Sequence, residues 1–171
     1  MESKLTNDQV LSAIRAQFGE VIGEEQQTTD GILNVFVDAT KSHDIIEWLY
    51  KHADFKVQFL TNITGIHILE NDPENELMVV YHLHSLQNNF RLRLKANLSI
   101  DNPTIGTITD VFSAANWLER ETYDFFGIIF EGHPNLVRIL NEDSMDYFPM
   151  RKQYHLEDET RQAKDNRFFG R

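Results

Sequence analysis

The chain has 171 residues, 41% of them hydrophobic, and contains no cysteine. This length suits one globular domain with a single core, and the missing cysteines exclude disulfides, thiolate nucleophiles and cysteine-held iron–sulfur clusters. The formal net charge of −11 argues against nucleic acid or an anionic membrane face as a partner, because either one requires a phosphate-neutralising surface. The longest fully apolar run, Leu77–Tyr81, is far below the ~20 residues of a membrane helix, so we expect a protein that is neither secreted nor membrane-spanning.

Two helices are predicted in the first third of the chain. Thr6 and Gln9 have the spacing of a capping box, and Gly19 is a typical helix end, which together predict a helix over residues 6–18. A second helix is predicted over residues 40–53. The residues that share one face of this helix are Ile45, Trp48, Leu49 and His52.

Strand-like segments alternate with these helices. Residues 21–29 and 32–38 are joined by Asp30-Gly31, whose glycine supplies the positive φ that a tight hairpin needs. Residues 55–63 alternate between apolar and polar side chains and predict a third strand.

The clearest hairpin joins residues 77–86 to residues 90–100. Its short turn predicts that Leu83 pairs with Leu92 across the two strands. Taken together, the segments predict an α+β fold with a mostly antiparallel sheet of about five strands and an extended C-terminal tail.

Two groups of side chains in this part of the chain resemble metal sites. The acidic group consists of Asp72, Glu74 and Glu76. It lacks the glycine and the terminal glutamate of an EF-hand, so we interpret it as a solvated turn. His82 and His84 lie on one strand face beside Arg93 and Arg91 in the expected register, and positive charge repels a dication. We therefore interpret this face as a polar outer surface that a partner can cover.

A third helix is predicted over residues 110–126, with Asp110 as its N-cap and Gly127 as its left-handed end. Its apolar side chains recur at three- and four-residue steps and form one buried stripe. The charged residues lie off that stripe and crowd one flank of the helix, beside aromatic bulk.

The stretch from Glu119 to Leu140 reads E-R-E-x-x-D-x-x-G-I-x-F-x-G-H-P-x-L-x-R-I-L. It resembles the signature of the C subunit of bacterial NADH-quinone oxidoreductase, respiratory complex I, which is similar to a mitochondrial subunit of that complex. Pro149-Met150-Arg151-Lys152 resembles the G-x-P-[LM]-R-K run of the family, with Tyr147 in place of its glycine. The residues expected to form a structural network and a partner interface are Glu119, Arg120, Glu121, Asp124, Gly127, Gly132, His133, Pro134, Arg138, Arg151 and Lys152.

The resemblance implies a non-catalytic structural subunit of the peripheral arm of proton-translocating NADH:quinone oxidoreductase. It implies that this chain binds no cofactor, and that flavin, iron–sulfur clusters and quinone belong to other subunits. It also implies docking of the D and B subunits on the cytoplasmic face of the bacterial inner membrane. An equivalent subunit of a related membrane-bound hydrogenase or ferredoxin-driven quinone reductase is the alternative within this group of complexes.

A stand-alone acid/base enzyme is the alternative from a different class. Its candidate residues are Glu119, Glu121, Asp124 and His133, since clustered carboxylates near a histidine can transfer protons. Arg120 and Arg138 can neutralise two of these acids, however, and no activated nucleophile or metal ligand set completes a mechanism. We therefore favour an ion-pair network that fixes the helix end and the turn at residues 132–134.

The C-terminal segment, residues 141–171, differs in charge from the rest of the chain. It contains 7 acidic and 6 basic residues, against 20 and 10 in residues 1–140. Its apolar residues follow no sustained period, and its basic residues alternate with aromatic ones, which interfaces enrich. We therefore expect a globular domain at 1–140 followed by a partner-binding tail that is mobile in the isolated chain.

Overall fold

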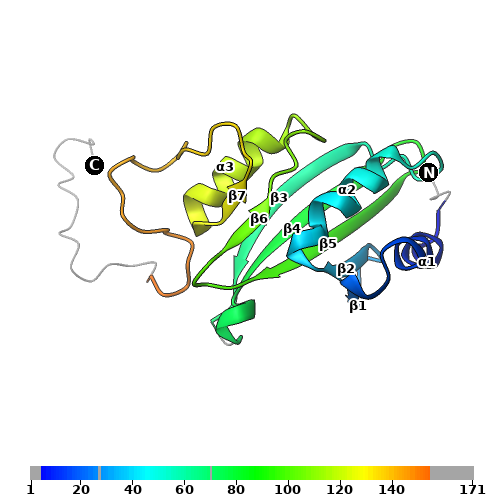
Figure 1. The fold of residues 1–171 in the computed structure, drawn as a ribbon, viewed down its shortest axis with the longest axis horizontal. Coiled ribbons are helices and arrows are strands. Elements are labelled where there is room, and N and C mark those ends of the chain that lie inside the picture. The colour runs from blue at the N-terminus through cyan, green and yellow to red at the C-terminus, as the bar shows by residue number, and fades with distance from the viewer. Residues whose placement is uncertain (1–4, 27, 70, 155–171) are drawn as a thin grey trace, which may run out of the picture.

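The computed structural model describes residues 5–26, 28–69 and 71–154, and its central element is a five-stranded sheet in the order β1-β2-β5-β4-β3 (Figure 1). The strands are β1 (Ile22–Glu25), β2 (Leu33–Val37), β3 (Phe59–His67), β4 (Leu77–Ser85) and β5 (Phe90–Leu98). Neighbouring strands are antiparallel except for β2 and β5, which are parallel. A second, two-stranded parallel sheet consists of β6 (Thr104–Gly106) and β7 (Ile129–Glu131). The predicted α+β class is confirmed.

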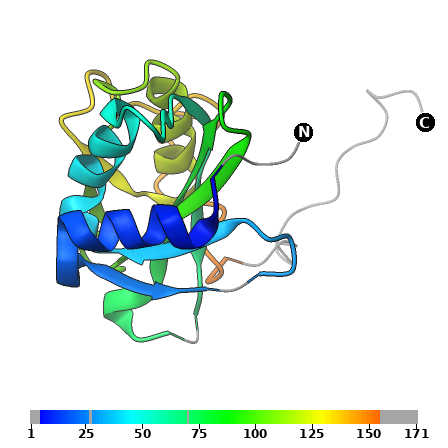
Figure 2. The ribbon, with the colours of Figure 1, turned by 90° about the vertical axis from the view of Figure 1, so that its right-hand side faces the viewer.

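The helices pack on one face of the large sheet. They are α1 (Asn7–Phe18), α2 (Ser42–Lys51) and α3 (Ala115–Phe126), with short 3-10 turns η1 (Gly19–Val21), η2 (Ala39–Lys41) and η3 (Pro73–Asn75). Alternate residues of β2, β4 and β5 are buried beneath them and form one core. Figure 2 shows α1 and α2 next to each other, where the ring of Phe18 packs edge-on against Trp48 at 5.7 Å.

Several local predictions are confirmed. Thr6 and Gln9 form the capping box of α1, and Gly19 ends the helix at a φ of 61°. Leu83 pairs with Leu92 across β4 and β5. Each of these features depends on residues close in sequence or on strand alternation, which the sequence displays directly.

Three predicted boundaries are wrong. The predicted strand at residues 21–29 ends at Glu25. The predicted strand at residues 55–63 begins only at Phe59, because Lys56 adopts a positive φ of 47° that interrupts the extended backbone. The third helix begins at Ala115, and Asp110 is not its N-cap. The chain before α3 forms a turn in which the Ile108 carbonyl accepts hydrogen bonds from two backbone N–H groups, and this turn occupies the expected first helical turn.

The C-terminal end of α3 packs closely against strand β3. A Cβ atom at Gly65 would lie 2.5 Å from Cδ2 of Phe126, so the phenyl ring rests directly on the strand backbone. The Thr122 hydroxyl also lies 3.5 Å from the carbonyl of Ile63. This contact sets the position of the C-terminal end of α3. Across the described ranges, no helix is both long and apolar enough to cross a bilayer.

Candidate functional site

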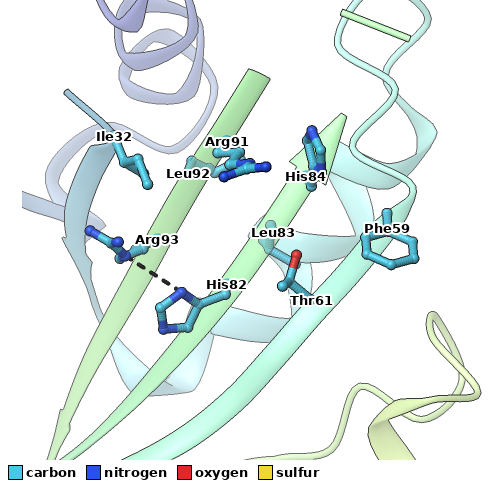
Figure 3. A pocket seen from close by; sticks show the side chains of 9 residues that line it. All are labelled: Ile32, Phe59, Thr61, His82, Leu83, His84, Arg91, Leu92 and Arg93. Carbon is cyan, nitrogen blue, oxygen red and sulfur yellow. Dashed lines mark hydrogen bonds between the residues drawn. The ribbon is translucent and has the colours of Figure 1, made fainter. Parts of the chain in front are cut away.

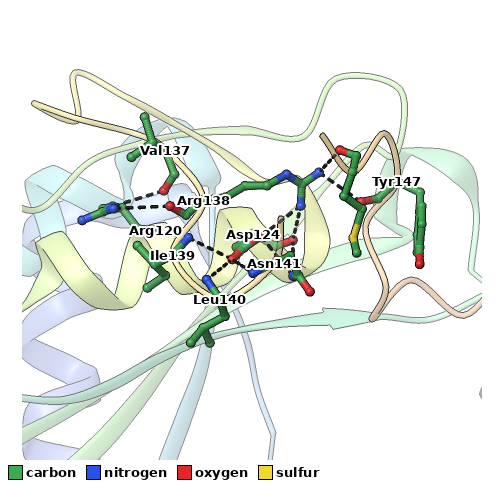
Figure 4. A network of polar contacts seen from close by, with 9 residues as sticks. Arg120, Asp124, Val137, Arg138, Ile139, Leu140, Asn141 and Tyr147 are labelled. Atoms are coloured by element: carbon green, nitrogen blue, oxygen red, sulfur yellow. Dashed lines mark hydrogen bonds and ion pairs between the residues drawn. The ribbon is translucent and has the colours of Figure 1, made fainter. Parts of the chain in front are cut away.

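The carboxylate of Asp124 is the centre of a polar network at the C-terminal end of α3 (Figure 4). Its Oδ2 accepts hydrogen bonds from the backbone N–H groups of Ile139, Leu140 and Asn141, at 3.0, 2.7 and 3.0 Å. Its Oδ1 accepts from the Asn141 side-chain amide at 3.0 Å and from Arg138 Nη1 at 2.9 Å. Asp124 is completely buried, so one side chain from the helix orients the whole turn after it.

This environment keeps Asp124 ionised. Burial alone would raise the pKa of its carboxyl, but the hydrogen bonds from Leu140, Asn141 and Ile139 outweigh that effect and hold the pKa well below its usual range. A carboxylate with every lone pair occupied and a depressed pKa is a poor proton acceptor at neutral pH. Its chemistry therefore favours a structural role.

Arg138 connects Asp124 to the segment that follows. Its Nη1 donates to the carbonyl and the carboxylate of Asp124, at 3.0 and 2.9 Å. Its Nη2 donates to the backbone carbonyls of Met145 and Tyr147, both at 3.0 Å (Figure 4). The fork of one guanidinium thus joins two chain segments, which a lysine cannot reproduce.

Phe148 fills the space beside Gly127. The guanidinium groups of Arg138 and Arg151 each lie 4.9 Å from the centre of its ring, a cation–π arrangement. Gly127 has the predicted left-handed conformation, with a φ of 73°, and a Cβ atom there would overlap the Phe148 ring. Gly127 is therefore required both for its backbone conformation and for close approach.

The segment up to Lys152 is attached to the body of the protein by backbone contacts. Arg151 Nε donates to the carbonyl of Phe126 at 2.7 Å. The Lys152 N–H donates to Nδ1 of the buried His67 at 2.7 Å, and the opposite ring nitrogen of His67 lies 2.6 Å from the Glu76 carboxylate. Residues 141–154 thus contact the core, although their apolar pattern did not indicate it. The rest of the predicted tail, residues 155–171, lies outside the described residues, and the division at residue 140 stays a prediction.

Glu119 is buried at a separate position, under the turn that precedes α3. Its oxygens accept hydrogen bonds from the Ile108 N–H at 2.8 Å and the Thr107 hydroxyl at 2.6 Å. Burial raises its pKa to about 7, against the opposing effect of these two hydrogen bonds. Glu119 therefore attaches the preceding loop to α3 and does not join the Asp124 network.

Arg120 forms no ion pair with an acid in the part of the chain that the structure describes, contrary to the sequence interpretation. Its Nε donates to the carbonyl of Val137 at 3.1 Å, and its guanidinium lies 4.9 Å from the ring centre of Trp117. The side chain of Trp117 is 62% exposed. Residues Val137 and Leu140 are also exposed, at 44% and 64%. Arg120 contacts both Trp117 and Val137, and these three residues form what we term the α3 apolar surface.

Both ring nitrogens of His133 interact with backbone groups and not with the signature acids. Its Nε2 lies 3.1 Å from the Asn116 carbonyl, and its Nδ1 accepts from the Asn135 N–H at 3.0 Å. Gly132, with a φ of 82°, and the exposed Pro134 complete the predicted turn. Glu121 is half-buried and forms no hydrogen bond or ion pair with the residues that the structure describes.

The proposed acid/base combination is therefore not assembled. Glu119, Asp124 and His133 each bind different partners, and within the described residues no three metal-ligating side chains converge. Sequence reasoning missed Asn141, Phe148 and His67. Each lies far in sequence from the group that it contacts, so no local pattern indicated these residues.

Comparison with known proteins finds similar chains in respiratory complexes. Residues 35–160 match the family described as respiratory-chain NADH dehydrogenase, 30 Kd subunit. The C subunit of NADH-quinone oxidoreductase from Citrifermentans bemidjiense is 44% identical over 128 residues, which cover 74% of this chain and 78% of that protein. The C subunit of the same enzyme from Geotalea uraniireducens is 34% identical over 168 residues, which cover 98% of this chain and 99% of that protein.

Two solved structures have a similar fold. The trypsin-resistant fragment (1-134) of Nqo5 superposes with a TM-score of 0.64 at 32% identity, covering 75% of this chain and 98% of the fragment. A chain in the membrane-bound sulfane sulfur reductase, an archaeal respiratory membrane complex, superposes with a TM-score of 0.71, covering 92% of this chain and 96% of its own length. Its identity of 22% supports a shared fold and no more.

Proposed function

Since this chain belongs to the family of the 30 Kd subunit of respiratory-chain NADH dehydrogenase, we propose that it is a non-catalytic structural subunit of the peripheral arm of a proton-translocating NADH:quinone oxidoreductase. In this role it docks the D and B subunits, which hold the quinone site and a terminal cluster, at the cytoplasmic face of the inner membrane. Its contribution to electron transfer is geometric, because transfer depends on neighbours held at fixed positions.

The observation that carries this proposal is how the acidic residues of the signature are used. The carboxylate of Asp124 accepts hydrogen bonds from backbone N–H groups and from Arg138. The carboxylate of Glu119 accepts a hydrogen bond from the backbone of the loop before α3. Both carboxylates are completely buried among these partners. The network instead fixes the backbone that presents the α3 apolar surface, and rigid Trp and Arg anchors are typical of interface hot spots.

Cofactors are expected on the neighbouring subunits. The sequence has no cysteine to hold a cluster, and no metal-ligand group occurs in the described residues. An equivalent subunit of a related hydrogenase or ferredoxin-driven quinone reductase would use the same surfaces. The identity of the co-purifying electron-input subunits distinguishes the two.

The test is affinity purification of the tagged chain from membranes of its native host. We expect the D and B subunits and NADH-dependent quinone reduction in the purified complex, and a flat visible spectrum for the chain expressed alone. Trp117→Ala should reduce the recovered D and B subunits at least tenfold, whereas Leu86→Ala, which removes a 63% exposed side chain elsewhere, should not. Stoichiometric flavin or iron on the isolated chain would contradict the proposal, as would equal recovery for both variants.

A further inference from the structure

The face of the large sheet opposite the helices is rich in positive charge (Figure 3). Five side chains of β4 and β5 form what we term the cationic sheet face: His82, His84, Arg91, Arg93 and Lys95. Figure 3 shows the first four of them. The register places His82 beside Arg93 and His84 beside Arg91, as the sequence predicts. This concentration of cations occurs on a chain with a net charge of −11, so it requires a specific explanation.

The face contains a hollow of about 290 Å³. Figure 3 shows His82, His84, Arg91 and Arg93 around it, with Phe59 and Thr61 of β3 on the far side. Phe59 is 46% exposed, and its ring packs edge-on against His84 at 6.3 Å. The hollow thus combines cationic groups with an exposed aromatic ring, a composition that protein interfaces enrich.

The positive charge is only partly balanced within the chain. Asp30 pairs with Arg93 at 2.7 Å, and it is the one acid among the described residues that forms an ion pair with this face. Lys95 donates to the neutral side chain of Gln26. Arg91 is exposed and forms no ion pair within the described part of the chain. The face therefore keeps a local excess of positive charge.

One histidine nitrogen on this face also lacks a hydrogen-bond partner. Nε2 of His84 is buried, and no described residue donates to it or accepts from it. A buried polar atom without a partner costs roughly 1–3 kcal/mol, so a bound group that supplies one gains stability. A carboxylate accepts a hydrogen bond from this nitrogen when the nitrogen carries a proton, and it also neutralises Arg91 beside it.

We propose that the cationic sheet face docks an acidic segment of a neighbouring subunit, with an Asp or Glu carboxylate in the hollow between His84 and Arg91. The proposal rests on the proposed function, because it assumes neighbouring subunits, and it adds the chemistry of the surface that they present. A polyanion such as nucleic acid fits less well, since three Arg or Lys side chains stand against an overall charge of −11. A protein segment needs only local complementarity.

The proposal predicts that docking takes up protons. Burial and then the neighbouring cations lower the pKa of both histidines, through Arg93 and Lys95 at His82 and through Arg91 at His84. From β3 the two histidines are faced by Phe59, Thr61 and Asn62, which carry no charge, and from the β1–β2 loop by Asp30, already bound to Arg93. A docked carboxylate would raise these pKa values, so affinity should increase by about threefold or more between pH 8 and pH 6.

The test places a photo-reactive phenylalanine analogue at Thr61 in the full chain, within the purified complex. Thr61 is exposed at the edge of the hollow. Irradiation and mass spectrometry should identify a cross-link to another subunit, in a segment with at least two Asp or Glu residues near the linked position. Cross-links only to basic or apolar segments, only within this chain, or to no protein at all would overturn the proposal.

Charge variants supply a second measurement. Arg91→Gln with Arg93→Gln should lower the retention of this subunit in the complex at least tenfold at low ionic strength. The isolated variant should still unfold cooperatively, at a melting temperature reduced only by the loss of the Asp30–Arg93 pair. The matched control, Arg15→Gln with Lys51→Gln, removes the same charge from exposed positions of α1 and α2 and should leave retention unchanged. Equal retention for both pairs contradicts this inference alone. Wild-type chain that co-purifies with no D or B subunit contradicts the proposed function itself, and this inference with it.

Discussion

The carboxylate of Asp124 and the guanidinium of Arg138 lie 2.9 Å apart, and their side chains are 0% and 9% exposed. This pair joins the end of α3 to the segment after β7, across 14 positions of sequence. The two side chains also form hydrogen bonds with backbone groups and with the Asn141 side-chain amide, so both charges are compensated. Removing either partner of such a buried pair strongly destabilises the fold, because the other charge is then buried without a counter-ion.

Replacing Asp124 by Asn should destabilise the chain strongly. The change leaves Arg138 buried without its counter-ion and weakens the acceptor of three backbone N–H groups, so we expect a loss of about 3 kcal/mol in the free energy of unfolding. Urea unfolding measures it. Asp143→Asn, at an exposed position, is the control and should change stability by less than about 0.5 kcal/mol. Equal stability of the two variants would contradict the network.

Replacing Arg138 by Lys tests the forked geometry separately from the charge. A lysine keeps the charge near Asp124 but cannot also reach the carbonyls of Met145 and Tyr147. Amide hydrogen exchange in residues 145–151 should therefore accelerate about tenfold or more, while exchange in the large sheet stays unchanged. Unchanged exchange in this segment would show that the fork does not hold it.

Gly127→Ala should cost more stability than a positive φ alone explains. The variant adds left-handed strain and pushes the Phe148 ring out of its position between two arginines, so we expect about 3 kcal/mol. Gly31→Ala is the matched control, with a φ of 69° and open space around the added Cβ, and should cost about 1 kcal/mol. Equal losses would mean that Phe148 packing contributes nothing.

Glu119 should make the chain less stable as pH rises. Its pKa is about 7 in the folded chain against 4.5 for the free side chain. Between these values the folded state holds the additional proton, so the free energy of unfolding should fall by up to about 3 kcal/mol from pH 4.5 to pH 7. Urea unfolding at pH 5 and pH 7.5 should show this decline in the wild type and a smaller one in Glu119→Gln. A decline of equal size in both would assign it to other groups.

Local order was predictable from the sequence, and long-range contacts were not. The capping box of α1 and the pairing of Leu83 with Leu92 follow from short spacings and strand alternation. The start of α3 was wrong because a turn at Ile108 replaces the first helical turn that an Asp N-cap favours.

The sequence predicted which residues form the candidate site, but it did not predict which partners most of them contact. An ion pair between Arg138 and one of the signature acids was anticipated, and the structure identifies that acid as Asp124. Among the described residues, Arg120 binds a carbonyl and an aromatic ring in place of the anticipated acid. The contact between His67 and Lys152 spans 85 positions, and no periodicity records such a pairing. Side-chain partners at this distance depend on how the elements pack, which composition does not encode.

The central claim is that the signature acids act through structure and take no part in proton transfer. The most direct measurement is NADH:quinone turnover per assembled complex, compared between wild type, Glu121→Gln and Asp124→Asn in the native membrane. We predict that the Asp124 variant lowers the amount of assembled complex, while turnover per complex stays within about twofold of wild type for both variants. Fully assembled complex whose turnover falls tenfold or more in either variant would contradict the claim and assign that carboxylate a role in proton chemistry.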